Sequence, residues 1–235
     1  MPGKKISYKE YVEAVSKISE ALTSGLYLED ILKLIVTVTA NVMKAKICGL
    51  WLLDEKENSL SIAATQSMSS EYLKERSLKV GEGIVGLAAG EKKPIAIADV
   101  SRDDRFREKE LAKKEGLVSM LSVPMMVKDR VKGVVNCYTT FPYEFTAGDI
   151  DLLSTVANQA GVAIENAELL TRVKLLQDEL ETRKRIEKAK GILIRRKKIP
   201  EEDAYNLIRE ASMSRRIPMK EIAEAIILSE EVAGI

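Results

Sequence analysis

Histidine is absent from the sequence, and cysteine occurs only twice, as Cys48 and Cys137. Without histidine, Ser-His-Asp and Cys-His catalysis, histidine-ligated haem and histidine-containing zinc sites are all excluded. Two cysteines cannot build a disulfide framework, and they suit a reducing compartment. We therefore expect a protein that is not an enzyme and that carries no metal and no cofactor.

Long apolar runs are also missing. The longest near-apolar run, Ile47 to Leu53, has seven residues, whereas a helix that spans a membrane needs about 20. The opening residues, MPGKKISYKE, lack the apolar core of a signal peptide. We therefore expect a cytoplasmic protein with no membrane partner. A composition of 46% apolar and 31% charged residues in 235 residues is that of one or two globular domains.

Charge is divided unevenly along the chain. Residues 1–171 carry 22 basic and 24 acidic side chains, whereas residues 172–235 carry 15 and 12. Within the second part, Arg183 to Lys198 contains nine basic residues and one acid, Glu187. Such an asymmetry indicates two modules, the second of which faces an anionic partner.

Apolar spacing predicts helices first and strands next. Residues at spacings of three and four indicate two helices over 12–42, separated at Gly25. The charged segment 99–114 is predicted to be a loop with a short helix. Alternating apolar residues predict five strands, at 47–53, 60–64, 95–100, 120–126 and 131–140.

The C-terminal part of the chain is predicted to be helical. A long helix begins near Thr146, because Thr146 and Asp149 resemble a capping box. Three helical segments follow Arg183, and Pro200 and Pro218 each fit the first position of a new helix.

Past residue 160, a second apolar stripe follows heptad spacing. Its members, which we call the seam, are Val162, Asn166, Leu169, Val173, Leu176 and Leu180. Spacings of 4, 3, 4, 3 and 4 residues predict a parallel two-stranded coiled coil, and thus a homodimer, with Asn166 as a polar residue that fixes the register. The alternative is a helix that packs this second face within its own chain.

The segment Gly81 to Gly90 has the glycine spacing of a dinucleotide-binding loop. Such a loop needs a strand before it and an acidic residue after a following parallel strand. Residues 77–80 are too short and mixed for that strand, and the acidic residue is missing. We therefore interpret the segment as a structural turn followed by a helix.

Read together, a series of short strings resembles the GAF sensory domain over about residues 8–168. The strings are Gly81-Glu-Gly-Ile-Val-Gly86, Pro94-Ile-Ala-Ile-Ala-Asp99, Asp103-Asp-Arg-Phe106, Leu121-Ser-Val-Pro124, Gly133-Val-Val135 and the stretch from Phe145 to Ala167. The resemblance implies an α+β fold, with a six-stranded antiparallel sheet, helices on one face and a small-molecule pocket on the other. The ligand of this pocket is not specified by the sequence.

Candidate ligand contacts in the implied pocket are aromatic. Trp51 and Phe106 are placed to form its walls, although an aromatic residue in a strand is also an ordinary core residue. Pigment-binding and haem-binding members of the family depend on histidine, which this chain lacks. The sulfoxide reductases of this fold use cysteines in pocket loops, whereas Cys48 and Cys137 both lie in predicted strands, where cysteine is usually a small buried apolar residue.

The C-terminal segment resembles the ANTAR domain over about residues 172–232. The characteristic string I-E-x-A-K-G-x-L is present as Ile186-Glu-Lys-Ala-Lys-Gly-Ile-Leu193, and Pro200-Glu-Glu-Asp-Ala204 follows it. The family is a three-helix RNA-binding module of bacterial antitermination regulators, and its targets are small hairpins with exposed loop bases. The resemblance implies RNA contacts by Ala189, Lys190, Gly191, Arg209, Ser212 and Met213.

Independently of the family resemblance, charge adds further candidate RNA contacts. The basic stripe consists of Lys184, Lys188, Gly191, Arg195 and Lys198, which recur at helical spacing. Lys188, Arg195, Arg215 and Arg216 are added as phosphate contacts on charge alone. Gly191 weakens a helix by about 1 kcal/mol relative to alanine, so it serves either close approach of an RNA backbone or packing against a neighbouring helix.

The sequence thus predicts a GAF-like sensory domain at residues 1–168, a coiled-coil linker helix at 162–182 and an all-α ANTAR-like domain at 183–235. We expect a homodimeric regulator that binds hairpins in nascent mRNA and prevents transcription termination, under the control of an unidentified small-molecule signal. Two alternatives stay open. A three-helix tail also accommodates the helix-turn-helix of a DNA-binding transcription factor, and the GAF fold also supports a redox enzyme.

Overall fold

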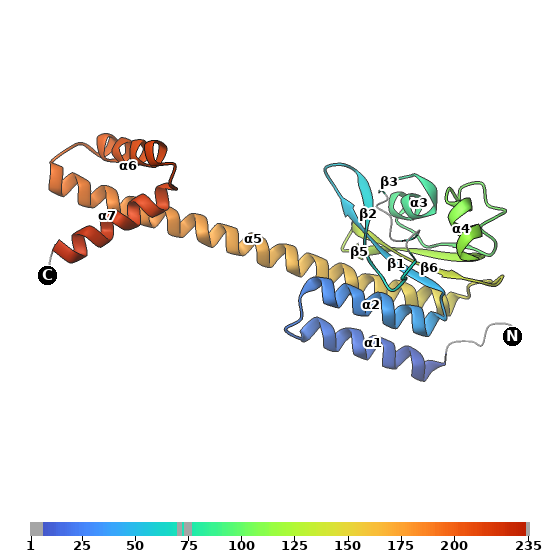
Figure 1. The fold of residues 1–235 in the computed structure, drawn as a ribbon. Coiled ribbons are helices and arrows are strands. Elements are labelled where there is room, and N and C mark those ends of the chain that lie inside the picture. The colour runs from blue at the N-terminus through green and yellow to red at the C-terminus, as the bar shows by residue number, and fades with distance from the viewer. Residues whose placement is uncertain (1–6, 70–71, 73–76, 234–235) are drawn as a thin grey trace. The chain divides into compact units, whose positions relative to one another are not determined.

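The computed structural model describes residues 7–69, 72 and 77–233 (Figure 1). The chain divides into two compact units, Met1–Ala167 and Glu168–Ile235. The three-part division predicted at 1–168, 162–182 and 183–235 stays a prediction.

The first unit is built on a six-stranded antiparallel sheet, as predicted. Its strands are β1 (Ile47–Asp54), β2 (Ser59–Thr65), β3 (Ser77–Lys79), β4 (Ile95–Ile97), β5 (Ser119–Val127) and β6 (Arg130–Thr139). They lie in the order β3-β2-β1-β6-β5-β4, and every neighbouring pair is antiparallel. The helices of this unit are α1 (Tyr8–Thr23), α2 (Leu28–Met43), α3 (Gly83–Glu91), α4 (Lys109–Glu115) and the first part of α5 (Ala147–Lys197).

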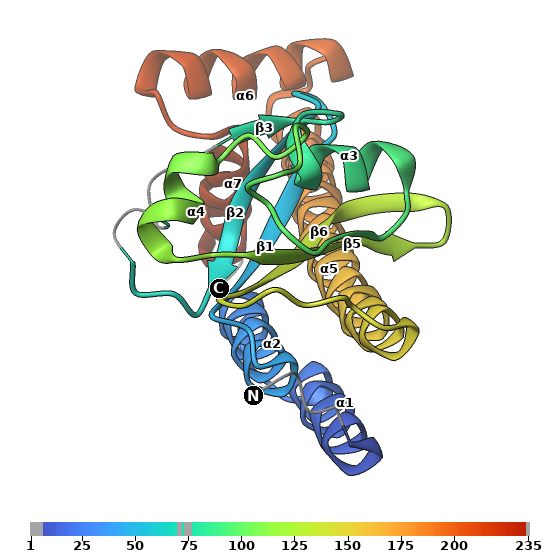
Figure 2. The ribbon, with the colours of Figure 1, turned by 90° about the vertical axis from the view of Figure 1, so that its right-hand side faces the viewer.

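Helices lie on both faces of the sheet (Figure 2), and each face carries its own apolar core. Successive strand residues point to opposite faces, so Leu50 packs under α1, α2 and α5, whereas Trp51 packs under α3 and α4. In the same way, Leu121 lies in the core that contains Leu50, and Met120 lies in the core that contains Trp51. The alternation that predicted the strands therefore also separates the two cores.

The glycine segment is a turn followed by a helix, as predicted. Gly81 and Gly83 have φ angles of +87° and +60°, which favour glycine, and a Cβ on Gly86 would lie 2.3 Å from the carbonyl oxygen of Lys79. Contrary to expectation, a strand does precede the segment. This strand, β3, pairs antiparallel with β2 at the edge of the sheet, so no dinucleotide-binding unit is formed.

The predicted capping box at the start of α5 is confirmed. The Oδ2 atom of Asp149 accepts a hydrogen bond from the Thr146 amide at 2.7 Å, and the Asp149 amide donates to Thr146 Oγ1 at 3.3 Å. Both partners satisfy amide groups that a helix terminus leaves unpaired.

The second unit contains the last part of α5 with α6 (Glu201–Arg215) and α7 (Met219–Ala233). Pro200 is the N-cap of α6, and Pro218 directly precedes α7, so each proline lies one position earlier than predicted. The helical segment around residues 186–193 belongs to α5. A small core joins the three helices and contains Ala189, Ile208, Ile222 and Ala223.

Among the described residues, none of the helices has the length and apolarity to cross a membrane. The same residues contain no cluster of three or more cysteine or carboxylate side chains arranged to hold a metal ion.

Candidate nucleic-acid interface

Ala189, an expected RNA contact, is buried in the structure. Its side chain has no exposed surface and packs against Ile208 and Ala223 in the small core of the second unit. The alanine in the characteristic string therefore allows α6 and α7 to approach α5 closely. In this conformation its methyl group offers no surface to a partner.

Lys190 lies at the junction of α5 and α6. Its ammonium is 2.7 Å from a carboxylate oxygen of Glu201 and 2.9 Å from one of Glu187, and the residue is only 8% exposed. The hydrogen bonds to Glu201 and Glu187 raise the pKa of Lys190, and Lys190 in turn lowers the pKa of Glu201. An RNA phosphate would have to displace two carboxylates to reach this ammonium.

We predict that Lys190→Met lowers the melting temperature of the second unit by a few degrees, because two carboxylates lose their common partner. RNA affinity should fall no further than it does in the matched variant Glu201→Gln. Circular dichroism melts and RNA titrations of the full chain test both statements. A loss of RNA affinity at unchanged melting temperature would instead show direct contact by Lys190.

Gly191 is not required for packing. A Cβ placed on it would meet only the Nη1 atom of Arg195, at 3.6 Å, which is an ordinary contact with the end of a flexible side chain. Of the two explanations that the sequence left open for Gly191, packing against a neighbouring helix therefore loses its support.

Several basic side chains of the second unit point into solvent without an acidic partner. Within residues 168–233, none of them has a carboxylate oxygen within 4.0 Å. We call them the open cations: Lys184, Arg195, Lys197 and Lys198 on α5, Arg209 and Arg215 on α6, and Arg216 just after it. They can bind phosphate oxygens without breaking any intramolecular pair.

The predicted contacts on α6 have different environments. The hydroxyl of Ser212 donates a hydrogen bond to the Ile217 carbonyl at 2.6 Å and so closes the turn before α7. Met213 is 67% exposed. Tyr205, which no sequence pattern singled out, is 43% exposed and lies four residues before Arg209. The four-residue spacing of Tyr205, Arg209 and Met213 places them on one side of α6, where an aromatic ring is available to stack on an unpaired base.

A second set of cations faces acidic side chains of α7. Arg185 and Arg196 form ion pairs with Glu224 and Glu230. The ammonium of Lys188 lies 3.0 Å from a carboxylate oxygen of Glu231. The sequence did not reveal these pairs, because their members are 34 to 43 residues apart and meet only when α7 folds onto α5.

The seam is solvent-exposed on α5. Asn166 is exposed, and the apolar seam residues are between 46% and 56% exposed. Residues 168–181 are exposed at every position. Within each unit taken by itself, the described residues leave the seam side chains uncovered.

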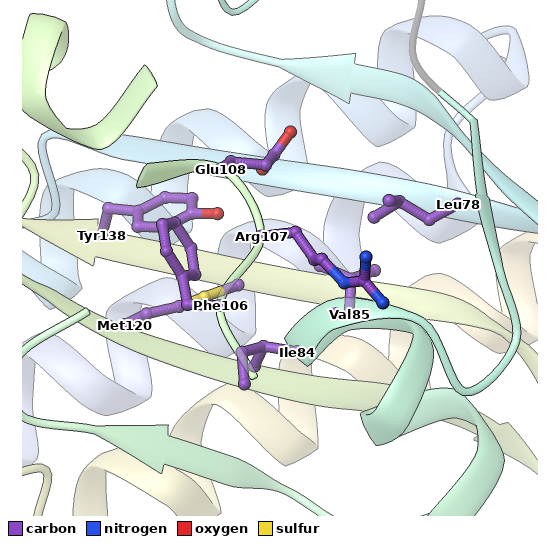
Figure 3. Close-up of a pocket in the computed structure, with 9 residues that line it drawn as sticks. Leu78, Ile84, Val85, Phe106, Arg107, Glu108, Met120 and Tyr138 are labelled. Atoms are coloured by element: carbon purple, nitrogen blue, oxygen red, sulfur yellow. The ribbon is translucent and has the colours of Figure 1, made fainter. Parts of the chain in front are cut away.

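The aromatic residues expected in the GAF pocket are separated. Phe106 lines a pocket together with Met120, Tyr138 and Arg107 (Figure 3). The cavity of this pocket has a volume of about 10 Å³, which is room for about one water molecule. Trp51 does not line this pocket. It is a fully buried core residue, and its indole donates a hydrogen bond to Asn136 at 3.1 Å.

Cys48 and Cys137 are neighbours across β1 and β6, and both are fully buried. Burial raises the pKa of the Cys48 thiol, and its hydrogen bond to Cys137 raises it further. Because the thiolate is the nucleophilic form, this environment opposes redox catalysis.

Comparison with protein families gives two matches. A model of the GAF domain matches residues 26–165, which is more than half of the chain. A model of the ANTAR domain matches residues 174–227.

Two curated proteins and one solved structure illustrate the similarity. The methyl sulfide methyltransferase-associated sensor of Methanosarcina acetivorans is 25% identical over 179 residues, which are 74% of this chain and 18% of that protein. The transcriptional regulatory protein PdtaR of Mycobacterium tuberculosis is 28% identical over 171 residues, 67% of this chain and 82% of that protein. The crystal structure of the GAF domain from an Acinetobacter phosphoenolpyruvate-protein phosphotransferase has a TM-score of 0.61 at 25% identity, covering 71% of this chain and 99% of that one.

Proposed function

Because the chain belongs to the GAF domain family and carries a C-terminal ANTAR domain, we propose that it is a regulator that binds hairpins in nascent mRNA and prevents transcription termination. The open cations on and beside α5 and α6 carry this proposal. They offer phosphate contacts along two helices that share a small apolar core. The proposed target places the action of the protein in the cytoplasm.

Single-stranded loop bases are the proposed point of recognition. Proteins read RNA sequence mainly at unpaired bases, whose faces and edges are accessible. Tyr205 and Arg209 offer flat side chains for stacking beside the phosphate-binding cations. This combination of an exposed ring and exposed guanidinium groups suits a hairpin loop better than the outer surface of a duplex.

We predict that the protein binds a stem-loop RNA at least about tenfold more tightly than duplex DNA of the same length, and that RNA affinity falls steeply between about 50 and 200 mM salt. Fluorescence anisotropy with both nucleic acids over this salt range measures both quantities. Equal or tighter binding of the duplex DNA would favour a DNA-binding transcription factor and would contradict the RNA proposal.

The regulator is proposed to act as a homodimer joined through the seam. Fourteen consecutive exposed residues, 168–181, form an uncovered stretch of α5, and helices in proteins gain most of their stability from the packing of an apolar face. A second copy supplies a matching stripe of apolar side chains at the same heptad positions. Two ANTAR domains in one dimer would then engage two hairpins.

The GAF domain is proposed to sense a small molecule in the pocket that Phe106 lines. With room for about one water molecule, this pocket must open for any larger ligand. A ligand that preferred the opened state would shift the population toward it. Redox catalysis is not proposed, because Cys48 and Cys137 are buried away from this pocket.

A further inference from the structure

Glutamate carboxylates of α7 form ion pairs with a row of three cations on α5. Arg185, Lys188 and Arg196 each contact a glutamate of α7. In the second unit, α7 crosses the C-terminal part of α5 (Figure 1). The contact therefore joins a strongly basic helix segment to the acidic side of its neighbour.

The three cations lie on one side of α5. At about 100° per residue, their side chains fall within a sector of about 80°. Lys184 and Arg195, two of the open cations, lie in the adjacent sector of the same helix. A polyanion that bound the open cations would thus lie beside the covered row.

These ion pairs are exposed to solvent. The side chains of Lys188 and Glu231 are each 60% exposed, and those of Arg196 and Glu230 are 42% and 35% exposed. Ion pairs in such surroundings are weak, because water and salt screen them. A phosphate oxygen can replace the carboxylate with little loss, in contrast to the pairs of Lys190, whose own side chain is only 10% exposed.

We propose that Arg185, Lys188 and Arg196 form a second phosphate-binding row, which the glutamates of α7 occupy in the free protein and which RNA takes over on binding. The glutamates Glu224, Glu230 and Glu231 thus act as an internal competitor that lowers RNA affinity. This inference rests on the proposed RNA binding.

A purely structural role for the same ion pairs makes the opposite prediction. If they serve only to hold α7 on α5, removing them weakens the unit and cannot improve RNA binding. Ile222 and Ala223 anchor α7 in the core independently of its glutamates. Glutamine at positions 230 and 231 should therefore leave the fold of the unit intact.

The test compares two double variants of the full chain with the same net charge. Glu230→Gln/Glu231→Gln removes two competitors, whereas Glu210→Gln/Glu221→Gln removes two exposed acids that contact no cation within residues 168–233. The probe is a fluorescein-labelled RNA with two stem-loops. The first variant should bind up to about tenfold more tightly than the second at about 50 mM salt, with a smaller gain at about 200 mM, where salt already weakens the internal pairs.

A third variant tests the covered row itself. Arg196→Gln, added to Glu230→Gln/Glu231→Gln, should lower RNA affinity again, because a phosphate contact is lost. Equal affinity of the two double variants, or no effect of this added substitution, overturns the inference. If circular dichroism shows that the double variant unfolds, Glu231→Gln alone is compared with Glu221→Gln, and equal affinity of these two overturns the inference in the same way.

The outcomes separate this inference from the proposed function. If the wild type binds RNA tightly and Glu230→Gln/Glu231→Gln does not raise the RNA affinity, only the inference of a covered phosphate-binding row is overturned. Absence of binding by every variant and by the wild type overturns both. Binding by the variant alone supports both, because the competitor then masks the site completely.

Discussion

Replacing Leu169 and Leu176 with lysine should convert the protein from a dimer into a monomer. Both side chains are more than half exposed in the single chain, so the substitutions remove little intrachain packing. In a coiled-coil dimer the same positions are buried, and lysine there would place charges in an apolar interface. Sedimentation velocity or light scattering measures the change in mass directly.

The same variant should bind a two-hairpin RNA at least about 100-fold more weakly, because joining two binding modules raises overall affinity by about 10² to 10⁴. Binding to a single hairpin should change by no more than about threefold, since each ANTAR domain keeps its own cations. A loss of affinity for the two-hairpin RNA that greatly exceeds the loss for the single hairpin therefore indicates loss of the dimer and not damage to the RNA site.

A matched control lies in the same helix segment. Leu170 and Leu175 are 71% and 60% exposed but lie outside the seam. Leu170→Lys/Leu175→Lys adds the same charge to the same stretch, and it should leave the dimer largely intact. If the seam variant stays dimeric, the interface lies elsewhere on the protein. If the control dissociates as completely as the seam variant, the register of the seam is wrong.

The sheet of the GAF domain was largely predictable, because its longest strands alternate clearly. The β1–β2 and β5–β6 hairpins follow from alternation and polar turns alone. β3 was missed because three residues are too short to show a period, and only pairing with β2 makes the segment a strand. β4 ends at Ile97, earlier than predicted, because Asp99 accepts a hydrogen bond from the Ser101 amide and turns the chain.

The candidate RNA site was predictable only as a region. Charge density and the characteristic string located it on α5, but a helical sequence does not show which cations its neighbours will neutralise. Lys190 and Lys188 have similar sequence surroundings. Lys190 nevertheless pairs with the first residue of α6, whereas Lys188 pairs with a glutamate of α7. The burial of Ala189 likewise depends on where α6 and α7 pack. These ion pairs and this burial depend on tertiary packing, and no local sequence pattern predicts them.

Gly191→Ala is the second substitution for which we expect a large effect, and its two consequences have opposite signs. Alanine favours a helix over glycine by about 1 kcal/mol, and the added Cβ meets only the end of Arg195. The free energy of unfolding should therefore rise. RNA affinity should fall by at least about tenfold, because a methyl group on the basic stripe would keep an RNA backbone at a distance and lengthen its contacts with neighbouring cations.

Gly148→Ala is the matched control, since it makes the same change in the same helix. Gly148 also has room for a Cβ, whose nearest neighbour would be Thr146 Oγ1 at 3.7 Å, and it lies at the first turn of α5, far along the helix from the basic stripe. This control should leave RNA affinity unchanged. Denaturant unfolding and RNA titration of both variants separate stability from contact. A Gly191→Ala protein that is more stable and binds RNA like the wild type would show that no backbone approaches Gly191 closely, and the phosphate contacts would then lie with the open cations on and beside α6.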